Sequence, residues 1–161
     1  MKKILIFLLI AIICISFFGC GKRYETNIKA SEIAESLKRS IVTDGGYRAP
    51  SESFMTINLG IPEHYMKDFE IIVAKDDVNQ NEIGVFRAES RSDAKEIAKY
   101  CQKYIDNVQA NYNPDYDPFE ATKVDNATVH IFGVYVIYTI LTPEDTDYAL
   151  IVIDNLISIG I

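Results

Sequence analysis

Acidic side chains between two prolines are the first residues of this sequence whose spacing could support chemistry. Asp115 and Asp117 lie in the segment Asn-Pro-Asp-Tyr-Asp-Pro-Phe, residues 113–119, and Glu120 follows it directly. Paired carboxylates can act as general acid and general base, as in the hydrolysis of a glycosidic bond. Aspartates beside prolines also form turns without any catalytic role, and we expect this explanation to hold. A carboxylate with a raised pKa in a pocket near these residues would instead favour a hydrolase.

Residue types that bind metals or form covalent intermediates are few and unsuitably spaced. Asp77, Asn79 and Asn81 place oxygen ligands at alternate positions, as a calcium loop does. The sixth position of that loop carries Glu instead of Gly, and the twelfth carries Ala instead of Glu. The two histidines, His64 and His130, have no ligand spacing, and no serine stands in a Gly-x-Ser-x-Gly turn. We therefore predict no metal, no cofactor and no catalytic residue.

Tyrosine is the residue type whose distribution favours binding. The chain has 10 Tyr and no Trp, and several of them gather near the end of a helix predicted over residues 91–112. Tyrosine is enriched where proteins bind partners, and its ring can stack on a sugar. We predict a weak binding patch at Tyr100, Tyr112 and Tyr116. The alternative is that these rings pack in the core and join the helix to the following loop.

The N-terminus has the order of charge and hydrophobicity of a secretory signal. Lys2 and Lys3 precede an apolar stretch over residues 4–15, and Gly19 leads into Cys20. As a helix, residues 4–18 would span about 22 Å, which is short of the ~30 Å hydrocarbon core of a bilayer. A transmembrane span is therefore the weaker interpretation, and we predict a signal peptide over residues 1–19.

The small residue before Cys20 resembles the lipobox of bacterial lipoproteins, in which the cysteine thiol receives a diacylglyceryl group and becomes the new N-terminus. Phe17 and Phe18 occupy the positions where lipoboxes usually carry Leu and a small residue. The resemblance implies cleavage between Gly19 and Cys20 and attachment to membrane lipid through Cys20, on the extracytoplasmic face of the cell membrane. Two alternatives remain, an uncleaved short anchor and a plain leader with an incidental cysteine.

Composition sets limits on the rest of the chain. The net charge is -7, and it becomes -9 without residues 1–19, because that segment carries two lysines and no acid. Such a charge excludes a nucleic-acid binder with a basic surface and disfavours close approach to anionic lipid headgroups. With Cys14 in the leader and Cys20 modified, only Cys101 remains, so the mature domain can form no internal disulfide.

Periodicity predicts the elements of one domain over residues 29–161, after a lipidated terminus and tether over residues 20–28. Ser31 begins a helix, and Pro62 starts a helical turn that reaches about Asp68. Residues 69–74 and 83–88 form a strand hairpin. A long helix follows over residues 91–112, with Ser90 and Asp93 as its capping box.

The C-terminal half repeats this order loosely. Strand signals lie around residues 122–124, 129–131 and 134–141, and the last of these is apolar on both faces, as a central strand would be. Thr142 and Pro143 begin a final helix. The sequence predicts a single compact α+β domain, with an antiparallel sheet of four to five strands packed against the long helix and the C-terminal helix.

Four short motifs resemble the bacterial lipoprotein family known as domain of unknown function 4358. They are Leu-Gly-Ile-Pro-Glu at 59–63, Glu-Ile-Gly-Val-Phe-Arg-Ala at 82–88, Tyr-x-Pro-x-Tyr at 112–116 and Gly-x-Tyr-Val at 133–136. The resemblance spans residues 31–156. It implies a fold and a location but no activity, because the family has none assigned.

These observations together predict a membrane-anchored bacterial envelope lipoprotein that binds a ligand or a protein and is not an enzyme. Its expected partners are membrane lipid through Cys20 and an envelope protein or cell-wall ligand, with no nucleic acid. The alternatives are an envelope hydrolase that uses Asp115, Asp117 or Glu120, and a structural spacer in an envelope assembly.

Overall fold

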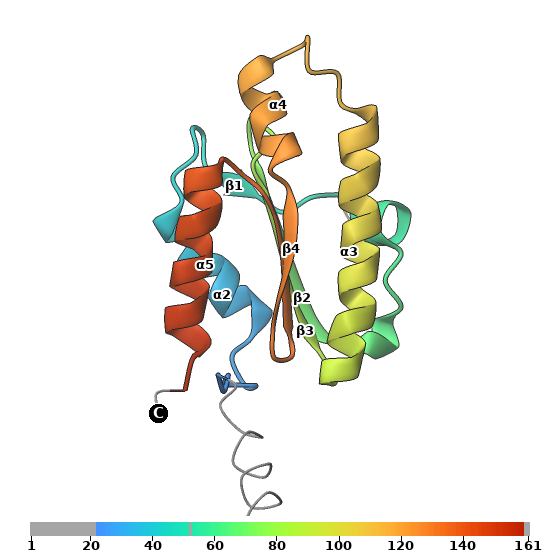
Figure 1. The fold of residues 1–161 in the computed structure, drawn as a ribbon, viewed down its shortest axis with the longest axis vertical. Helices are drawn as coiled ribbons and strands as arrows, with labels where there is room; N and C mark the ends of the chain where they lie inside the picture. Colours follow the sequence, from blue (N-terminus) through green and yellow to red (C-terminus); the bar gives the residue numbers. More distant parts are fainter. Residues whose placement is uncertain (1–21, 52, 160–161) are drawn as a thin grey trace, which may run out of the picture.

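The computed structural model describes residues 22–51 and 53–159, which form a five-stranded antiparallel sheet between two helical layers (Figure 1). The strands run in the order β1-β2-β3-β5-β4, and every neighbouring pair is antiparallel. Their bounds are β1 Tyr47–Arg48, β2 Met66–Ala74, β3 Glu82–Ala88, β4 Thr128–Phe132 and β5 Tyr135–Ile140. The predicted α+β domain with four to five strands is confirmed. The predicted cleavage site at Gly19 and Cys20 lies outside the described residues.

The helices cover both faces of the sheet. α2 (Ala30–Ser40) and α5 (Pro143–Ile157) pack on one face, and α3 (Arg91–Asn111) packs on the other (Figure 1). The sheet therefore separates two apolar cores. Every residue of β5 is buried, as the apolar run at 134–141 predicted for a strand covered on both faces.

Side-chain caps explain where the two longest helices begin. The Ser90 hydroxyl accepts a hydrogen bond from the Asp93 amide at 3.1 Å, so α3 starts at the predicted capping box. In the same way the Thr142 hydroxyl accepts from the Asp145 amide at 3.2 Å, with Pro143 at the first position of α5.

The predicted strand around residues 122–124 is wrong, because this segment is the helix α4 (Pro118–Asp125). The Asp117 carboxylate accepts hydrogen bonds from the amides of Phe119 and Glu120, and Pro118 stands at the first helical position. A cap followed by proline decides the structure here over the β-branched residues of the segment.

Two smaller boundaries also differ from the prediction. α2 starts before Ser31, since the Asp68 carboxylate accepts a hydrogen bond from the Ala30 amide at 2.8 Å and Lys29 is the N-cap. The turn at Pro62 is a 3-10 turn over Glu63–Tyr65 and does not reach Asp68, because β2 begins at Met66. A π-helical turn, Met55–Leu59, lies before it.

Residues 22–28 are part of the domain, which differs from the predicted tether over residues 20–28. Tyr24 pairs with Ser158 in an isolated β-bridge, and the Glu25 amide donates to the Ile157 carbonyl at 2.7 Å. The N-terminal segment is thus bound to the end of α5. Among the described residues, no helix combines the length and the apolar content needed to cross a bilayer.

Candidate functional site

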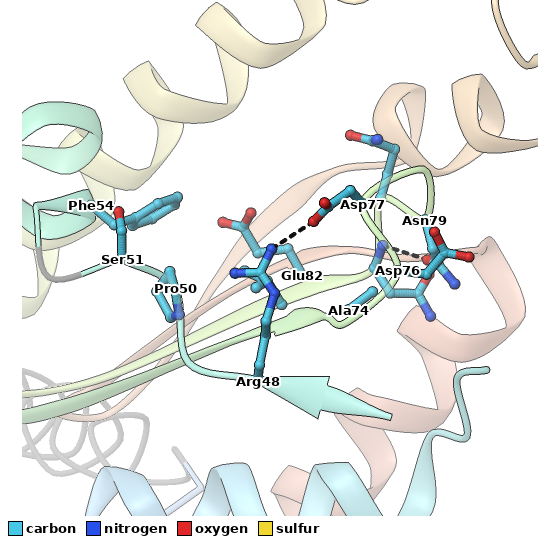
Figure 2. Close-up of a pocket in the computed structure, with 12 residues that line it drawn as sticks. Arg48, Pro50, Ser51, Phe54, Ala74, Asp76, Asp77, Asn79 and Glu82 are labelled. Carbon is cyan, nitrogen blue, oxygen red and sulfur yellow. Dashed lines mark hydrogen bonds and ion pairs between the residues drawn. The ribbon is translucent and has the colours of Figure 1, made fainter. Parts of the chain in front are cut away.

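A cleft of about 280 Å³ opens at one edge of the sheet, where β1 and the β2–β3 loop meet the segment before the π-helical turn (Figure 2). The ends of β2 and β3 form part of its wall. Its lining residues are Arg48, Pro50, Ser51, Phe54, Val73, Ala74, Asp76, Asp77, Asn79, Gln80, Asn81 and Glu82. Most of these side chains are polar, and three of them are acids.

Glu82 is the chemically unusual residue of the cleft. It is 9% exposed, and its two carboxyl oxygens accept hydrogen bonds from the Tyr138 hydroxyl at 2.5 Å and the Tyr104 hydroxyl at 3.1 Å. Burial disfavours the charged carboxylate and raises the pKa of Glu82 to about 7, although the two tyrosine hydroxyls oppose this shift. Near neutral pH this carboxyl can therefore either donate or accept a proton.

The sheet makes room for this arrangement at Gly84. A Cβ atom at Gly84 would lie 2.0 Å from Cε1 of Tyr138, which pairs with Gly84 across β3 and β5. The Tyr138 ring therefore lies directly on the glycine backbone, and its hydroxyl reaches Glu82 two residues earlier on β3. Tyr104 approaches from α3 and packs edge to face on Tyr138, with ring centroids 5.6 Å apart.

The rim of the cleft carries an exposed ion pair and an aromatic ring. Arg48 donates to the Asp77 carboxylate at 2.8 Å, and both side chains are well exposed. Phe54 lines the opposite wall and packs edge to face on Tyr104, so it contacts the residue that holds Glu82. An apolar hollow of about 320 Å³ on the other side of Phe54, bounded also by Phe69, shares three residues with the cleft.

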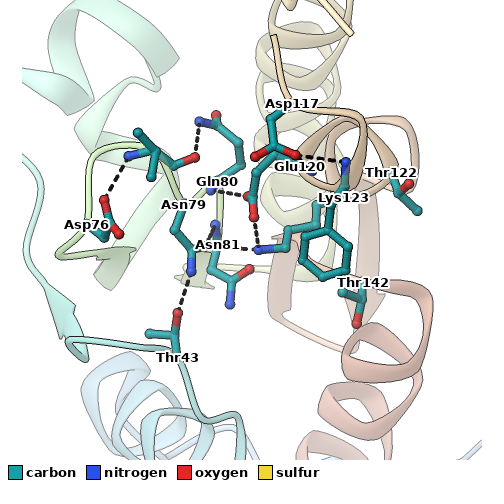
Figure 3. A network of polar contacts seen from close by, with 12 residues as sticks. Thr43, Asp76, Asn79, Gln80, Asn81, Asp117, Glu120, Thr122, Lys123 and Thr142 are labelled. Carbon is teal, nitrogen blue, oxygen red and sulfur yellow. Dashed lines mark hydrogen bonds and ion pairs between the residues drawn. The ribbon is translucent and has the colours of Figure 1, made fainter. Parts of the chain in front are cut away.

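A buried network holds the β2–β3 loop in place behind the cleft (Figure 3). Glu120 and Lys123 of α4 form an ion pair at 2.7 Å with side chains 9% and 4% exposed. Glu120 also accepts from the Gln80 amide at 2.6 Å, and Lys123 donates to the Asn79 side chain at 3.0 Å. Beside this network, Asn81 Oδ1 is buried and receives no hydrogen bond from the described residues.

A comparison with protein families places the cleft in a known domain family. A family model described as domain of unknown function (DUF4358) matches residues 48–141. The chain belongs to this family. The resemblance in the four short motifs is thereby confirmed. No curated protein and no solved structure matches the chain.

The DUF4358 match contains the whole cleft. Its first residue is Arg48, and it includes the lining residues up to Glu82 as well as Tyr104 and Tyr138. The helices α2 and α5 lie outside the match. The cleft is thus built from the part of the chain that defines DUF4358.

Of the three tyrosines predicted as one binding patch, Tyr100 lies apart from Tyr112 and Tyr116 in the DUF4358 domain. Tyr100 and Tyr112 are twelve residues apart on or beside α3, which corresponds to about 18 Å along a helix. Tyr100 lines a separate hollow of about 390 Å³ beside the π-helical turn. Tyr112 is half-buried and donates to the Asp117 carbonyl at 3.4 Å, whereas Tyr116 is 75% exposed.

The three carboxylates considered for a hydrolase are either exposed or engaged in contacts that hold the fold together. Asp115 is exposed in the turn, Asp117 caps α4, and Glu120 is held by Lys123 and the Gln80 amide. None of the three lines the cleft. The carboxyl with a raised pKa in a pocket is instead Glu82.

The described residues contain no cluster that could hold a metal ion, and their cysteine is buried. No group of three or more His, Cys, Asp or Glu side chains in residues 22–51 and 53–159 could hold a metal ion. In the calcium-like loop, Asn79 Oδ1 is occupied by the Asn81 amide and by Lys123. Cys101 lies buried on the apolar face of α3, and burial raises the pKa of its thiol.

Sequence reasoning did not identify Glu82 as a site residue, although it included this residue in a family motif. The available signal was an acid at the start of a strand that is otherwise apolar apart from Arg87, with a glycine two residues after the acid. Its hydroxyl partners are 22 and 56 residues away in the chain. No local pattern connects residues at such separations.

Proposed function

We propose that this protein is a lipid-anchored extracytoplasmic binding module whose cleft at Glu82 takes a small polar ligand. The anchor is Cys20, as the leader and the residues around it indicate. The ligand carries hydroxyl or amine donors, as fragments of the bacterial cell wall do. Non-enzymatic binding is the proposed activity.

The chemistry of the lining supports a hydrogen-bond-donating ligand. The cleft contains three acids, Asp76, Asp77 and Glu82, and one cation, Arg48, which is already paired with Asp77. Phe54 offers an aromatic surface between the polar cleft and the apolar hollow. Convergent polar groups beside an aromatic face are typical of sites for small ligands.

The observation that carries the proposal is the buried Glu82 carboxyl at the wall of the cleft. Burying an ionisable group costs stability compared with an apolar side chain of similar size. Two tyrosine hydroxyls fix the position of this carboxyl. The same bonds satisfy the two buried hydroxyls, and they hold the carboxyl at the wall of the cleft, where a ligand can meet it.

Binding is tested by nuclear magnetic resonance titration with soluble muropeptides released from the cell wall. We expect shifts in the amide signals of Asp77 and Asn81, and a loss of affinity of about tenfold or more in Glu82→Gln, because the substitution replaces one acceptor oxygen with an NH2 donor and removes the charge. Glu89→Gln is the matched control, because Glu89 is exposed and outside the cleft lining. Signal shifts confined to residues outside the cleft, or equal affinities of Glu82→Gln and Glu89→Gln, would count against the cleft as the binding site.

The anchor needs a separate experiment. Cys20→Ala should abolish incorporation of labelled palmitate and should leave the precursor uncleaved or release the protein from the membrane. Unchanged labelling would show that the lipid is not attached at Cys20.

One observation favours the hydrolase alternative. The pKa of Glu82, raised to about 7, is close to the value that suits a general acid at neutral pH. In that case Glu82 would donate its proton to the leaving oxygen of a bound glycoside, or to the leaving nitrogen of a bound amide, while water adds to the carbon of the broken bond. Chromatography of muropeptides incubated with the protein decides between the two functions, because only a hydrolase gives products, and Glu82→Gln should then abolish them.

A further inference from the structure

A basic hollow lies at the end of the molecule away from the β2–β3 loop. It has a volume of about 220 Å³ and is lined by three cations, one tyrosine and two residues of the β4–β5 hairpin. These six residues are Lys22, Tyr24, Arg91, Lys95, Ile131 and Gly133. The lining contains no acid, although the chain as a whole has a net charge of -7.

Three elements that are distant in sequence meet at this basic hollow. The N-terminal segment, the tip of the β4–β5 hairpin and the first turn of α3 lie at the lower end of the view in Figure 1. Tyr24 packs edge to face on Phe132 with ring centroids 5.7 Å apart, and its Cβ lies near Gly133. The hollow is therefore part of the packed fold.

Two of its three cations remain available to an external anion. Lys22 is paired with Asp154 at 2.6 Å. Arg91 and Lys95 are exposed and form no ion pair with any other residue of the described ranges. Ile131, which is 46% exposed, adds an apolar side chain to the rim.

The position of Lys22 connects this hollow to the proposed anchor. Only residue 21 separates Lys22 from Cys20, and two residues of extended chain span at most about 7 Å between Cα atoms. A lipid on Cys20 therefore brings Lys22 to the headgroup region of the bilayer. This placement of Lys22 rests on the proposed lipid anchor at Cys20.

We propose that the basic hollow docks on the anionic lipid headgroups of the membrane that holds Cys20. Arg91 and Lys95 then bind headgroup phosphates, and Ile131 enters the interface. The β2–β3 loop and α4 lie at the opposite end of the sheet, so the cleft beside them faces away from the bilayer (Figure 1). Docking orients the domain, whereas the lipid only retains it.

The experiment measures how well each lysine is protected in the full lipid-anchored protein. The protein is reconstituted into vesicles of phosphatidylglycerol and phosphatidylethanolamine, or of phosphatidylcholine alone, and is labelled with a membrane-impermeant amine reagent. Mass spectrometry then gives the labelling of each lysine. In anionic vesicles we expect labelling of Lys22 and Lys95 to fall about fivefold or more relative to neutral vesicles, and labelling of Lys75 at the opposite end to stay unchanged.

Charge reversal on α3 provides the matched variants. Arg91→Glu with Lys95→Glu should remove the protection of Lys22. Both positions are exposed, and an acid at residue 91 suits the N-terminal turn of α3, so the fold is retained. Lys99→Glu with Lys103→Glu makes the same charge change further along α3 and should leave the protection intact. Both control lysines are exposed.

The outcomes separate the docking surface from the anchor. Equal labelling of Lys22 and Lys95 in both kinds of vesicle, with the protein still floating with them, overturns the docking surface while the anchor stands. Equal changes in the protection of Lys22 in the two double variants also overturn the docking surface. If the isolated full-length protein is found to carry no lipid on Cys20 and does not float with vesicles, the proposed function itself is overturned.

Discussion

Replacing Glu82 with glutamine should change how the stability of the fold depends on pH. The glutamine side chain has nearly the same shape and can still bond to the hydroxyls of Tyr104 and Tyr138, but it does not titrate. In the wild-type protein, burial raises the pKa of Glu82 from an ordinary value of 4.5 to about 7. The folded state therefore holds this proton at pH values where the unfolded chain has lost it.

The direction and size of the effect follow from this difference in proton binding. Below pH 4.5 Glu82 is protonated in both the folded and the unfolded protein, and its contribution to the free energy of unfolding is fully present. Between pH 4.5 and about 7 the folded state binds one more proton than the unfolded state, so stability falls by about 1.4 kcal/mol per pH unit. The wild-type protein should lose about 3 kcal/mol from this residue across the window, and Glu82→Gln should lose none of it.

Urea denaturation followed by circular dichroism at several pH values between 4.5 and 8 measures the effect. The informative quantity is the difference in unfolding free energy between wild type and Glu82→Gln, because other groups that titrate contribute equally to both. Glu89→Gln, at an exposed position, should follow the wild type. A difference between wild type and Glu82→Gln that stays constant to within about 0.5 kcal/mol from pH 4.5 to 7 would refute the reasoning about burial.

Three further predictions concern buried residues around the site. Gly84→Ala should lower the melting temperature through a loss of about 2 kcal/mol or more, since its Cβ would lie 2.0 Å from the Tyr138 ring; an unchanged melting temperature would contradict this close approach. Lys123→Met leaves the buried Glu120 carboxylate without its cation and should cost about 3–5 kcal/mol in denaturation experiments, and adding Glu120→Gln should recover most of that loss. Cys101 should react with a thiol reagent at pH 8 only after unfolding, because it is buried and the pKa of its thiol is raised; rapid reaction of the native protein would be inconsistent with this.

Where local chemistry determines an element, the sequence was sufficient to predict it. The capping box at Ser90 and Asp93 and the Thr-Pro start at Thr142 fixed two helices before any tertiary contact was considered. The helix α4 carries the same kind of signal at Asp117 and Pro118. The strand prediction at 122–124 gave β-branched residues more weight than this cap, and a consistent use of the capping rule would have avoided the error.

The cleft was harder to predict, because its central residue depends on strand pairing. β3 aligns with β5 so that Gly84 faces Tyr138, and this register brings the Tyr138 hydroxyl to Glu82. Moving one strand by a single residue would turn Tyr138 to the opposite face. Composition and local periodicity contain no information about that register, so the acid at the start of β3 could not be assigned a role from the sequence.

The acidity of the domain led to the expectation that it would avoid anionic lipid, whereas the proposed docking of the basic hollow depends on the local charge rather than on the net charge. α3 has 21 residues and is therefore about 30 Å long, which is three to four times the Debye length of about 8–10 Å at physiological salt. Acids beside the cleft, such as Asp76 and Asp77, are screened from a surface at the other end of the molecule. What a membrane senses is the charge within one Debye length. There the basic hollow contributes Arg91 and Lys95, while of the acids nearby Asp93 is engaged by Ser90 and Asp154 by Lys22. A net charge of -7 and attraction to an anionic bilayer are compatible when the surface that meets the lipid carries cations left unpaired by the described residues in this way.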